Sequence, residues 1–424
     1  MRWRPRVPSA NTAGLAGHAG LAVARSGIDA LGSGLLVIVI ARGLGASALG
    51  VYVYAATVGA LVYAVGSLSI TPVVAREVAR RPELVRAIAS AALQLRIYVV
   101  LPLNVAAIAL IALVLPMTGP TRLVTALLAV AVGLGFVTDV AFGLFQATTR
   151  FRVPLAITAV YKLATLTVTI AVISRGGNLI DIASVVVVLQ VGQALLAIGL
   201  VARLITPIDW WPQPASWLRL AREASPLAAA SLADTISNRA DIVILGLLRP
   251  VSDVGLYSAA YNLYIGATVV VAAVQVALLP AFARSSEGTF AQLWRRSAIT
   301  VCALGLVMGS LFVVLASGLI HVAYGSTLAA AAQPLRILGP AAAVFVTERL
   351  LLTTLISRGR QRYVLYAMIP SAVTNVVLNF ALVPLYSYNG AAAATLGSEL
   401  VVLLIAAFLV WSRVPLLRAR TALQ

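Results

Sequence analysis

Residues 225–283 contain two apolar runs, and each is long enough to cross a lipid bilayer as a helix, which takes about 20 residues. The first run carries three ionisable side chains, Asp234, Arg239 and Asp241. A charge inside a membrane helix costs roughly 2.5–3.5 kcal/mol on insertion scales, so it normally faces a partner or a wet cavity. A polar joint, RPVSD at 249–253, separates the two runs. This stretch therefore predicts paired membrane helices around a polar interior.

The composition of the whole chain agrees with a membrane protein. Of 424 residues, 61% are hydrophobic and 10% are charged, and the mean hydropathy is +1.00, whereas a soluble protein is about a quarter charged. The net charge is +18, but the arginines lie at the ends of apolar runs rather than on one polar face, which argues against nucleic acid as a partner. The single cysteine, Cys302, allows no disulfide framework and no cysteine-based metal site.

Twelve apolar runs qualify as membrane spans. They should all be helices, because a backbone in lipid must satisfy its own hydrogen bonds and the runs lack the alternation of a barrel. The predicted spans are 15–40, 50–74, 88–115, 121–145, 153–174, 180–203, 225–248, 255–281, 297–320, 330–356, 363–385 and 389–412.

The chain matches itself at an offset of 205 residues. Residues 26–52 slide onto 231–257 without a gap, and Ser, Asp, Gly and Tyr positions coincide. We predict an all-α integral membrane fold with two parallel-repeat six-helix bundles around a central cavity, although chance similarity between Ala/Val/Leu-rich segments is the alternative. The predicted domains are an N-terminal bundle at 1–203, a cytoplasmic linker at 204–222 and a C-terminal bundle at 223–424.

Arginines predict the orientation of the chain. Joints on one side of the predicted bundles carry 21 arginines and joints on the other side carry 4. Basic joints stay in the cytoplasm, so both termini are expected there. The basic N-terminus is interpreted as a cytoplasmic tail rather than a signal peptide, because no small-residue cleavage site follows a short apolar core.

An ordered series of short motifs resembles one family. ARGLG at 41–45 with LGVY at 49–52, NRAD at 238–241 with VGLYSAAY at 254–261, PLRIL at 334–338, and NVVLN at 375–379 with GAAAAT at 390–395 are similar to segments of bacterial polysaccharide flippases. These flippases belong to the multidrug/oligosaccharidyl-lipid/polysaccharide exporter (MOP) superfamily. The resemblance implies a transporter that flips polyprenyl-diphosphate-linked oligosaccharide to the outer leaflet by alternating access.

The resemblance also implies where the protein works and with what. We expect a multi-pass protein of the bacterial cytoplasmic membrane, whose partners are the lipid-linked glycan, membrane lipid and the glycan polymerase or ligase machinery. It is not expected to be an enzyme, because the sequence shows no metal-ligand cluster, nucleophile elbow or P-loop and no joint long enough for a sugar-transfer domain. The competing hypothesis is an ion-coupled multidrug antiporter on the same scaffold.

Buried cations are the candidate substrate-binding residues. A diphosphate needs positive charge at membrane depth, and the arginine fork suits phosphate oxygens best. Once the arginines of the joints are set aside, six basic residues remain, and we select Arg25, Arg239 and Lys162, the only lysine. Arg96 and Arg336 lie nearer span ends, where snorkelling is the simpler explanation.

Buried acids are the candidates for coupling transport to an ion, with no cofactor expected beyond a proton or a sodium ion. Asp29, Asp234 and Asp139 are our choices, since a buried carboxylate can exchange either ion as a cavity reorients. Asp29 lies four residues after Arg25, on the same helix face. The alternative is that each acid only neutralises a neighbouring arginine. Tyr257, Tyr261 and Tyr264 could stack on sugars, but helix packing explains their spacing as well.

Overall fold

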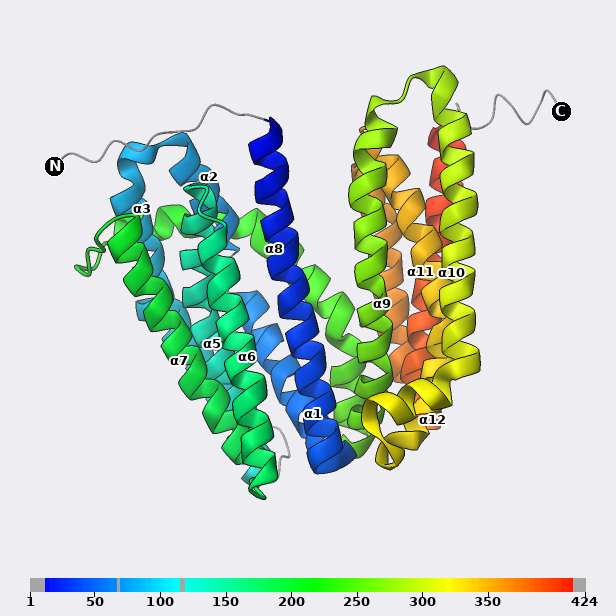
Figure 1. Cartoon of the computed structure of the whole chain (residues 1–424), viewed down its shortest axis with the longest axis horizontal. Coiled ribbons are helices and arrows are strands. Elements are labelled where there is room, and N and C mark those ends of the chain that lie inside the picture. The colour runs from blue at the N-terminus through cyan, green and yellow to red at the C-terminus, as the bar shows by residue number, and fades with distance from the viewer. Residues whose placement is uncertain (1–11, 67–68, 115–118, 415–424) are drawn as a thin grey trace. The chain divides into compact units, whose positions relative to one another are not determined.

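The structure, a computed structural model, describes residues 12–66, 69–114 and 119–414. Within these ranges all regular secondary structure is helical (Figure 1). Lipid permits this arrangement because each helix closes its own backbone hydrogen bonds. The long helices are α1 (Thr12–Gly66), α5 (Gly119–Ala147), α6 (Arg152–Ser174), α7 (Leu179–Leu204), α8 (Pro214–Leu248), α9 (Val251–Arg284), α10 (Glu287–Tyr324), α11 (Ala332–Ser357) and α12 (Arg362–Arg413).

Shorter elements complete the chain. Helices α2 (Ile70–Arg80), α3 (Val85–Gln94) and α4 (Leu101–Val114) are joined by the 3₁₀ turn η1 (Pro82–Leu84) and the π-helical stretch η2 (Leu95–Val100), and the 3₁₀ turn η3 (Ser326–Ala331) precedes α11. Among the described residues, seven helical segments are long and apolar enough to cross a membrane. An all-helical, multi-pass membrane protein is therefore confirmed.

Two of the longest helices each contain a break. Gly45 interrupts α1 with φ +81°, and Ser387 interrupts α12 with φ +51°. Both residues lie between two predicted spans, 15–40 and 50–74 in α1, 363–385 and 389–412 in α12. Each merged helix is thus two helical segments, which is compatible with the predicted spans. The count of twelve and the parallel repeat stay predictions.

The chain packs as two compact units. Unit 1 is Met1–Val39 with Val51–Ile236, and unit 2 is Ile40–Gly50 with Ser237–Gln424. The division in the chain falls inside α8, because the first turns of that helix pack with the N-terminal helices. These units are defined by contacts alone, so the bundle boundaries 1–203, 204–222 and 223–424 stay a prediction.

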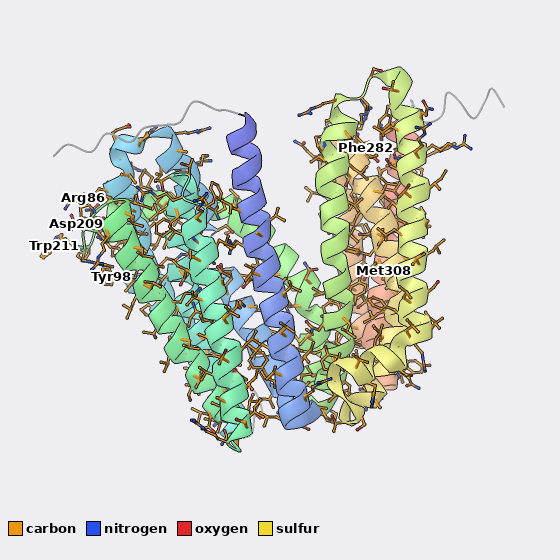
Figure 2. The ribbon with its side chains drawn as sticks, in the orientation of Figure 1. Arg86, Tyr98, Asp209, Trp211, Phe282 and Met308 are labelled. Atoms are coloured by element: carbon orange, nitrogen blue, oxygen red, sulfur yellow. The ribbon has the colours of Figure 1, made fainter. Side chains whose placement is uncertain are left out.

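Unit 1 holds residues 205–213, the non-helical part of the predicted linker, against its own surface. Ser90 Oγ accepts a hydrogen bond from Asp209 N at 2.8 Å, and Gln94 Nε2 donates to the carbonyls of Asp209 at 2.6 Å and Trp211 at 2.8 Å. Figure 2 shows Asp209 and Trp211 close to Tyr98, whose hydroxyl donates to Trp210 O. These hydrogen bonds attach residues 205–213 to unit 1, so the segment is not a free linker.

Unit 2 is built from α9, α10, α11 and α12, and Figure 1 shows α10 and α11 side by side. Its core includes Phe282 of α9, which is fully buried and labelled with Met308 of α10 in Figure 2. Residues 40–50 of α1 belong to this unit as well. There, Arg42 Nε donates to Ala323 O at 2.8 Å near the end of α10.

Two glycines let residues 40–50 approach α9 backbone to backbone. A Cβ atom on Gly50 would lie 1.8 Å from Val251 O, and a Cβ atom on Gly255 would lie 2.0 Å from Ala46 O. No L side chain fits at these distances. The contact is reciprocal, since Gly255 lies 205 residues after Gly50 and Val251 lies 205 residues after Ala46, the same offset that the sequence shows.

Two helix-to-helix turns have the same backbone hydrogen bonds. In the α5–α6 turn, the N–H groups of residues 148, 149, 150 and 153 donate to the carbonyls of 144, 146, 145 and 150. In the α11–α12 turn, residues 358, 359, 360 and 363 donate to 354, 356, 355 and 360, an offset of 210 at every bond. Thr149 (φ +59°) and Gly359 (φ +71°) occupy the equivalent left-handed position.

Candidate functional site

Lys162 and Asp29 form an ion pair inside unit 1. Lys162 Nζ, on α6, lies 2.9 Å from Asp29 Oδ1 on α1 and also donates to Ser33 Oγ at 2.7 Å. The Lys162 side chain is 17% exposed, whereas that of Asp29 is 54% exposed. Asp29 is therefore the more exposed member of the ion pair, and Lys162 is the more buried one.

Arg25 lies one helical turn before Asp29, with its guanidinium over an aromatic ring. Its Cζ atom is 5.5 Å from the centroid of Phe142 in α5. Among the residues that the structure describes, its buried Nε has no hydrogen-bond partner. The expected proximity of Arg25 to Asp29 on one helix face holds, but the ion pair of Asp29 is with Lys162. Arg25 consequently keeps donor capacity for a ligand.

Asp139 is at the centre of a second polar group in unit 1. Tyr63 Oη donates a short hydrogen bond to Asp139 Oδ2, and the Tyr63 ring stacks on Phe136 at 3.7 Å between centroids. The charges of Arg96, Arg25 and Asp29 all act on Asp139. The two polar groups are therefore one electrostatic system.

Arg96 corrects the expectation of a snorkelling side chain. It is 1% exposed, and its guanidinium lies 5.0 Å from the centroid of Phe136. Arg96 sits in the π-helical stretch η2, whose wider turn changes which residues face inward. Apolar periodicity assumes a regular α-helix, so the inward orientation of Arg96 could not be predicted from the sequence.

The described ionisable side chains of this system carry an excess of positive charge. Arg25, Arg96 and Lys162 contribute three cations, and Asp29 and Asp139 contribute two anions. Asp139 of this system lines a cavity of about 360 Å³ together with Tyr52, Tyr63, Tyr161 and Gln190, and the three cations are not among its described lining residues. This volume lies within the usual range of roughly 300–1,000 Å³ for small-molecule sites.

In unit 2, Asp241 is held by hydrogen bonds. Tyr257 Oη makes a short bond to Asp241 Oδ2 and lies 3.1 Å from Thr395 Oγ1. Arg239 interacts electrostatically with Asp241 and Tyr261. Arg239 thus belongs to unit 2 while Arg25 and Lys162 belong to unit 1, so a cavity common to all three stays a prediction. The side chain of Asp234 lies outside the described part of the structure.

The tyrosine stripe of α9 is packed rather than open. Tyr257 and Tyr264 are 0% and 3% exposed, and the rings of Tyr257, Tyr261 and Tyr264 stack in sequence at 5.3 and 5.6 Å. Tyr264 Oη donates to Glu399 Oε1 at 3.3 Å. These side chains therefore fill unit 2 and orient its acids, the second of the two interpretations.

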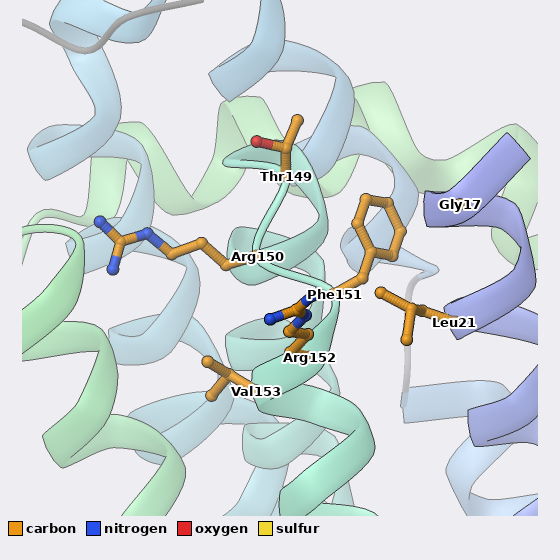
Figure 3. Close-up of a pocket in the computed structure, with 7 residues that line it drawn as sticks. All are labelled: Gly17, Leu21, Thr149, Arg150, Phe151, Arg152 and Val153. Carbon is orange, nitrogen blue, oxygen red and sulfur yellow. The ribbon is translucent and has the colours of Figure 1, made fainter. Parts of the chain in front are cut away.

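A second cavity, of about 630 Å³, lies between α1 and the α5–α6 turn. Its lining includes Arg150 and Arg152 beside the apolar Leu21 and Phe151. Figure 3 shows Phe151 directed toward α1 and Arg150 extending to the opposite side of the turn. Such a mixture of apolar and cationic groups suits an amphipathic anion.

Comparison with known proteins identifies relatives. The sequence profile of the family described as "Polysaccharide biosynthesis protein" matches residues 26–286. No curated protein sequence matches the chain.

Solved transporter structures share the fold over nearly the whole chain. A multidrug resistance MATE family transporter of the MOP superfamily, in an inward-facing conformation, aligns with 94% of this chain and 99% of its own at 13% identity and a TM-score of 0.74. The lipid II flippase MurJ, inward closed, aligns with 92% and 87% at 13% identity and a TM-score of 0.76. A MOP superfamily transporter from Pyrococcus furiosus aligns with 93% of each chain at 13% identity and 0.57.

Proposed function

Because this chain belongs to the polysaccharide biosynthesis protein family, we propose that it is a polysaccharide flippase of the MOP superfamily and moves polyprenyl-diphosphate-linked oligosaccharide across the membrane. The direction is from the inner to the outer leaflet, and the product serves cell-surface polysaccharide synthesis. The relatives that share its fold are transporters and a flippase rather than enzymes.

One observation carries the proposal: unit 1 contains three cations against two carboxylates, and one of these carboxylates, Asp139, lines a cavity of ligand size. A lipid-linked glycan has a diphosphate that must be sheltered from hydrocarbon, while its polyprenyl tail can stay in lipid. Cations fixed at membrane depth replace the water that the phosphates lose. An uncompensated positive charge supplies that attraction before the ligand arrives.

Lys162 can exchange Asp29, its partner in the ion pair, for a ligand. With the cavity empty, Asp29 and Ser33 satisfy the lysine. A phosphate oxygen near Arg25 competes with Asp29 for Lys162, and the more exposed carboxylate then turns toward water. Asp29 also remains our first candidate for taking up a proton or a sodium ion, followed by Asp139 and Asp234, as the bundles alternate.

The arrangement of the protein in the membrane is part of the proposal. Two parallel six-helix bundles with both termini in the cytoplasm are supported by the 21-to-4 arginine asymmetry and by the matching hydrogen bonds of the two turns. A bacterial cytoplasmic membrane follows from the resemblance to bacterial flippases. Arg150 and Arg152 lie on the arginine-rich side, where the lipid headgroup would first meet the protein.

A multidrug antiporter is the second candidate, favoured by the shared fold with a multidrug resistance transporter. Many drugs exported by such transporters are cations, and a cavity with a net positive surrounding repels them. The charge balance of unit 1 therefore supports the diphosphate over the drug.

The test uses purified protein in liposomes and a polyprenyl diphosphate that carries a fluorescent neutral oligosaccharide. The variants are Arg25→Ala, Lys162→Ala and Arg239→Ala, with Arg175→Ala, an exposed arginine after α6, as the matched control. Each lost charge-assisted hydrogen bond is worth about 1.5–3 kcal/mol, so each variant should slow translocation at least about tenfold. Control and wild type should move the probe equally fast.

Two outcomes would overturn the proposal. Unchanged translocation in all three variants would show that these cations do not hold the diphosphate. Transport of a cationic dye by the wild type, with no movement of the diphosphate probe, would establish the antiporter instead.

A further inference from the structure

Unit 2 contains a pair of acidic side chains that the proposed site does not use. Glu348 of α11 is 0% exposed, and Glu399 of α12 is partly buried. Their side chains lie within hydrogen-bonding reach of each other. Both line one small cavity of about 60 Å³ with Asp241, Ser371 and Ser398.

The neighbours of this pair do not supply enough donors for two ionised carboxylates. Tyr264 Oη donates to Glu399 Oε1 at 3.3 Å. Arg349 Nε lies 3.3 Å from Glu348 Oε1, while its guanidinium is over the Phe345 ring. Among the described residues, neither carboxylate oxygen of Glu348 accepts a hydrogen bond. A buried acceptor without a donor normally costs about 1–3 kcal/mol, more when charged, so a missing donor is indicated.

A single proton supplies that donor and balances the charge. Two ionised carboxylates beside one arginine leave a net negative charge in a buried place, whereas one proton makes the set of Glu348, Glu399 and Arg349 neutral. Two carboxyl groups in contact cannot both ionise readily, and they characteristically share a proton.

We propose that Glu348 and Glu399 hold one exchangeable proton between them and form a proton-coupling site of the transporter, distinct from the candidate acids of unit 1. One carboxyl oxygen carries the proton and donates it to the other acid. On release, the proton passes to water in the cavity, and both acids are left ionised beside Arg349. The statement about coupling rests on the proposed function; the shared proton does not.

The surroundings determine what this site can take. The cavity has room for a few water molecules but not for a sugar ring. The charged and titratable groups that face the pair are Arg349 on α11, Tyr261 and Tyr264 on α9, and Asp241 on α8, with Arg239 acting on Asp241. Tyr257 already donates to Asp241 and Tyr264 to Glu399, so Glu348 is the acid of this cavity whose oxygens lack a hydrogen-bond donor among the described residues.

Infrared spectroscopy of the full-length protein in lipid nanodiscs tests the shared proton without any substrate. A protonated carboxyl group gives a C=O band separate from those of carboxylates and amides. The wild type at neutral pH should show one such band, and Glu348→Gln and Glu399→Gln should each remove it. In each variant the new amide donates to the remaining acid, so the protein should stay folded. Glu83→Gln, at an exposed acid of η1, is the matched control and should keep the band.

A second variant provides a readout that a purely structural role would not change. Tyr264→Phe removes the donor to Glu399 and leaves both acids in place. The carboxyl band should then shift in frequency and remain.

Three results would contradict the proposal. The first is no protonated carboxyl band in the wild type. The second is a band that persists in both Glu→Gln variants, since it would belong to another acid. The third is a melting temperature that rises with NaCl but not with choline chloride while the band is absent, which would identify a sodium site.

A transport assay then distinguishes a failure of proton coupling from a failure of flipping. In liposomes with a pH gradient, wild-type transport of the labelled polyprenyl diphosphate should speed up severalfold, and Glu399→Gln should move the probe at one rate with and without the gradient. If the variant responds to the gradient as the wild type does, the pair is not the coupling site. If neither protein moves the probe, the proposed function fails while the infrared result stands.

Discussion

The polar interiors of unit 1 and unit 2 differ in the balance between acidic and basic side chains. In unit 1, Arg25, Arg96 and Lys162 outnumber Asp29 and Asp139 by one. In unit 2, the acids Asp241, Glu348 and Glu399 outnumber Arg239 and Arg349 by one. Helices of similar composition thus enclose one region that attracts anions and another that attracts protons.

The backbone around these interiors is much more alike than the side chains. The α5–α6 and α11–α12 turns have the same four hydrogen bonds at an offset of 210. At that offset the counterpart of Asp139 is Arg349, so the two equivalent positions carry opposite charges. Two helix-to-helix turns can thus share one backbone pattern while the side chains around them carry different chemistry. Three experiments test this difference between the units.

The largest effect is expected from removing Arg96. In Arg96→Leu, Asp139 loses a cation that acts on it in a buried place, and the cost of breaking a buried ion pair, about 3–5 kcal/mol, is the upper bound of the expected loss. The melting temperature of the purified protein should fall sharply, and Asp139→Asn in the same chain should restore much of it. A double-mutant cycle measures this coupling. Strictly additive effects would show that the two side chains are independent and that the charge count of unit 1 is wrong.

A smaller loss is expected at the reciprocal glycines. Gly50→Ala and Gly255→Ala each push a methyl group into a backbone carbonyl, and such overpacking costs about 1–3 kcal/mol. The control is Gly266→Ala, in the same helix as Gly255, where a Cβ atom meets nothing within 4 Å. The melting temperature should drop equally for the first two and hold or rise for the control. Unequal losses would argue against equivalent repeat positions.

The smallest effect concerns the two matching turns and should have opposite signs. Thr149 holds a left-handed conformation that a β-branched residue adopts at a cost of roughly 1–2 kcal/mol, whereas Gly359 adopts it freely. Thr149→Gly should therefore stabilise the protein by about 1 kcal/mol, and Gly359→Thr should destabilise it by a similar amount. Thermal unfolding of both variants checks this. Changes of the same sign would show that the turns differ in spite of their common hydrogen bonds.

The helices could be predicted well from the sequence, because lipid leaves few alternatives for an apolar run of about 20 residues. Lys162 was selected for its depth in a span, and the structure places it in an ion pair with Asp29. Its partner was not predictable from Arg25 and Asp29 alone, since the nearest charge along a helix need not be the nearest across helices.

Other features depend on tertiary geometry and left no trace in periodicity. Arg96 points inward because of the π-helical stretch, and Glu348 meets Glu399 only because α11 and α12 pack together. Nothing in the spacing of 51 residues between Glu348 and Glu399 indicates a contact. The family resemblance covered their surroundings without marking either residue.

The assignment of residues 40–50 to unit 2 bears on how the polypeptide matures. Helix α1 is synthesised first, yet the environment of its middle section is encoded some 200 residues later. Until α9 has been synthesised, the backbone at Gly50 lacks the α9 carbonyl group against which it packs. If the gene is split between the two halves, each fragment should accordingly be degraded when it is expressed alone. The two fragments should be stable when they are expressed together.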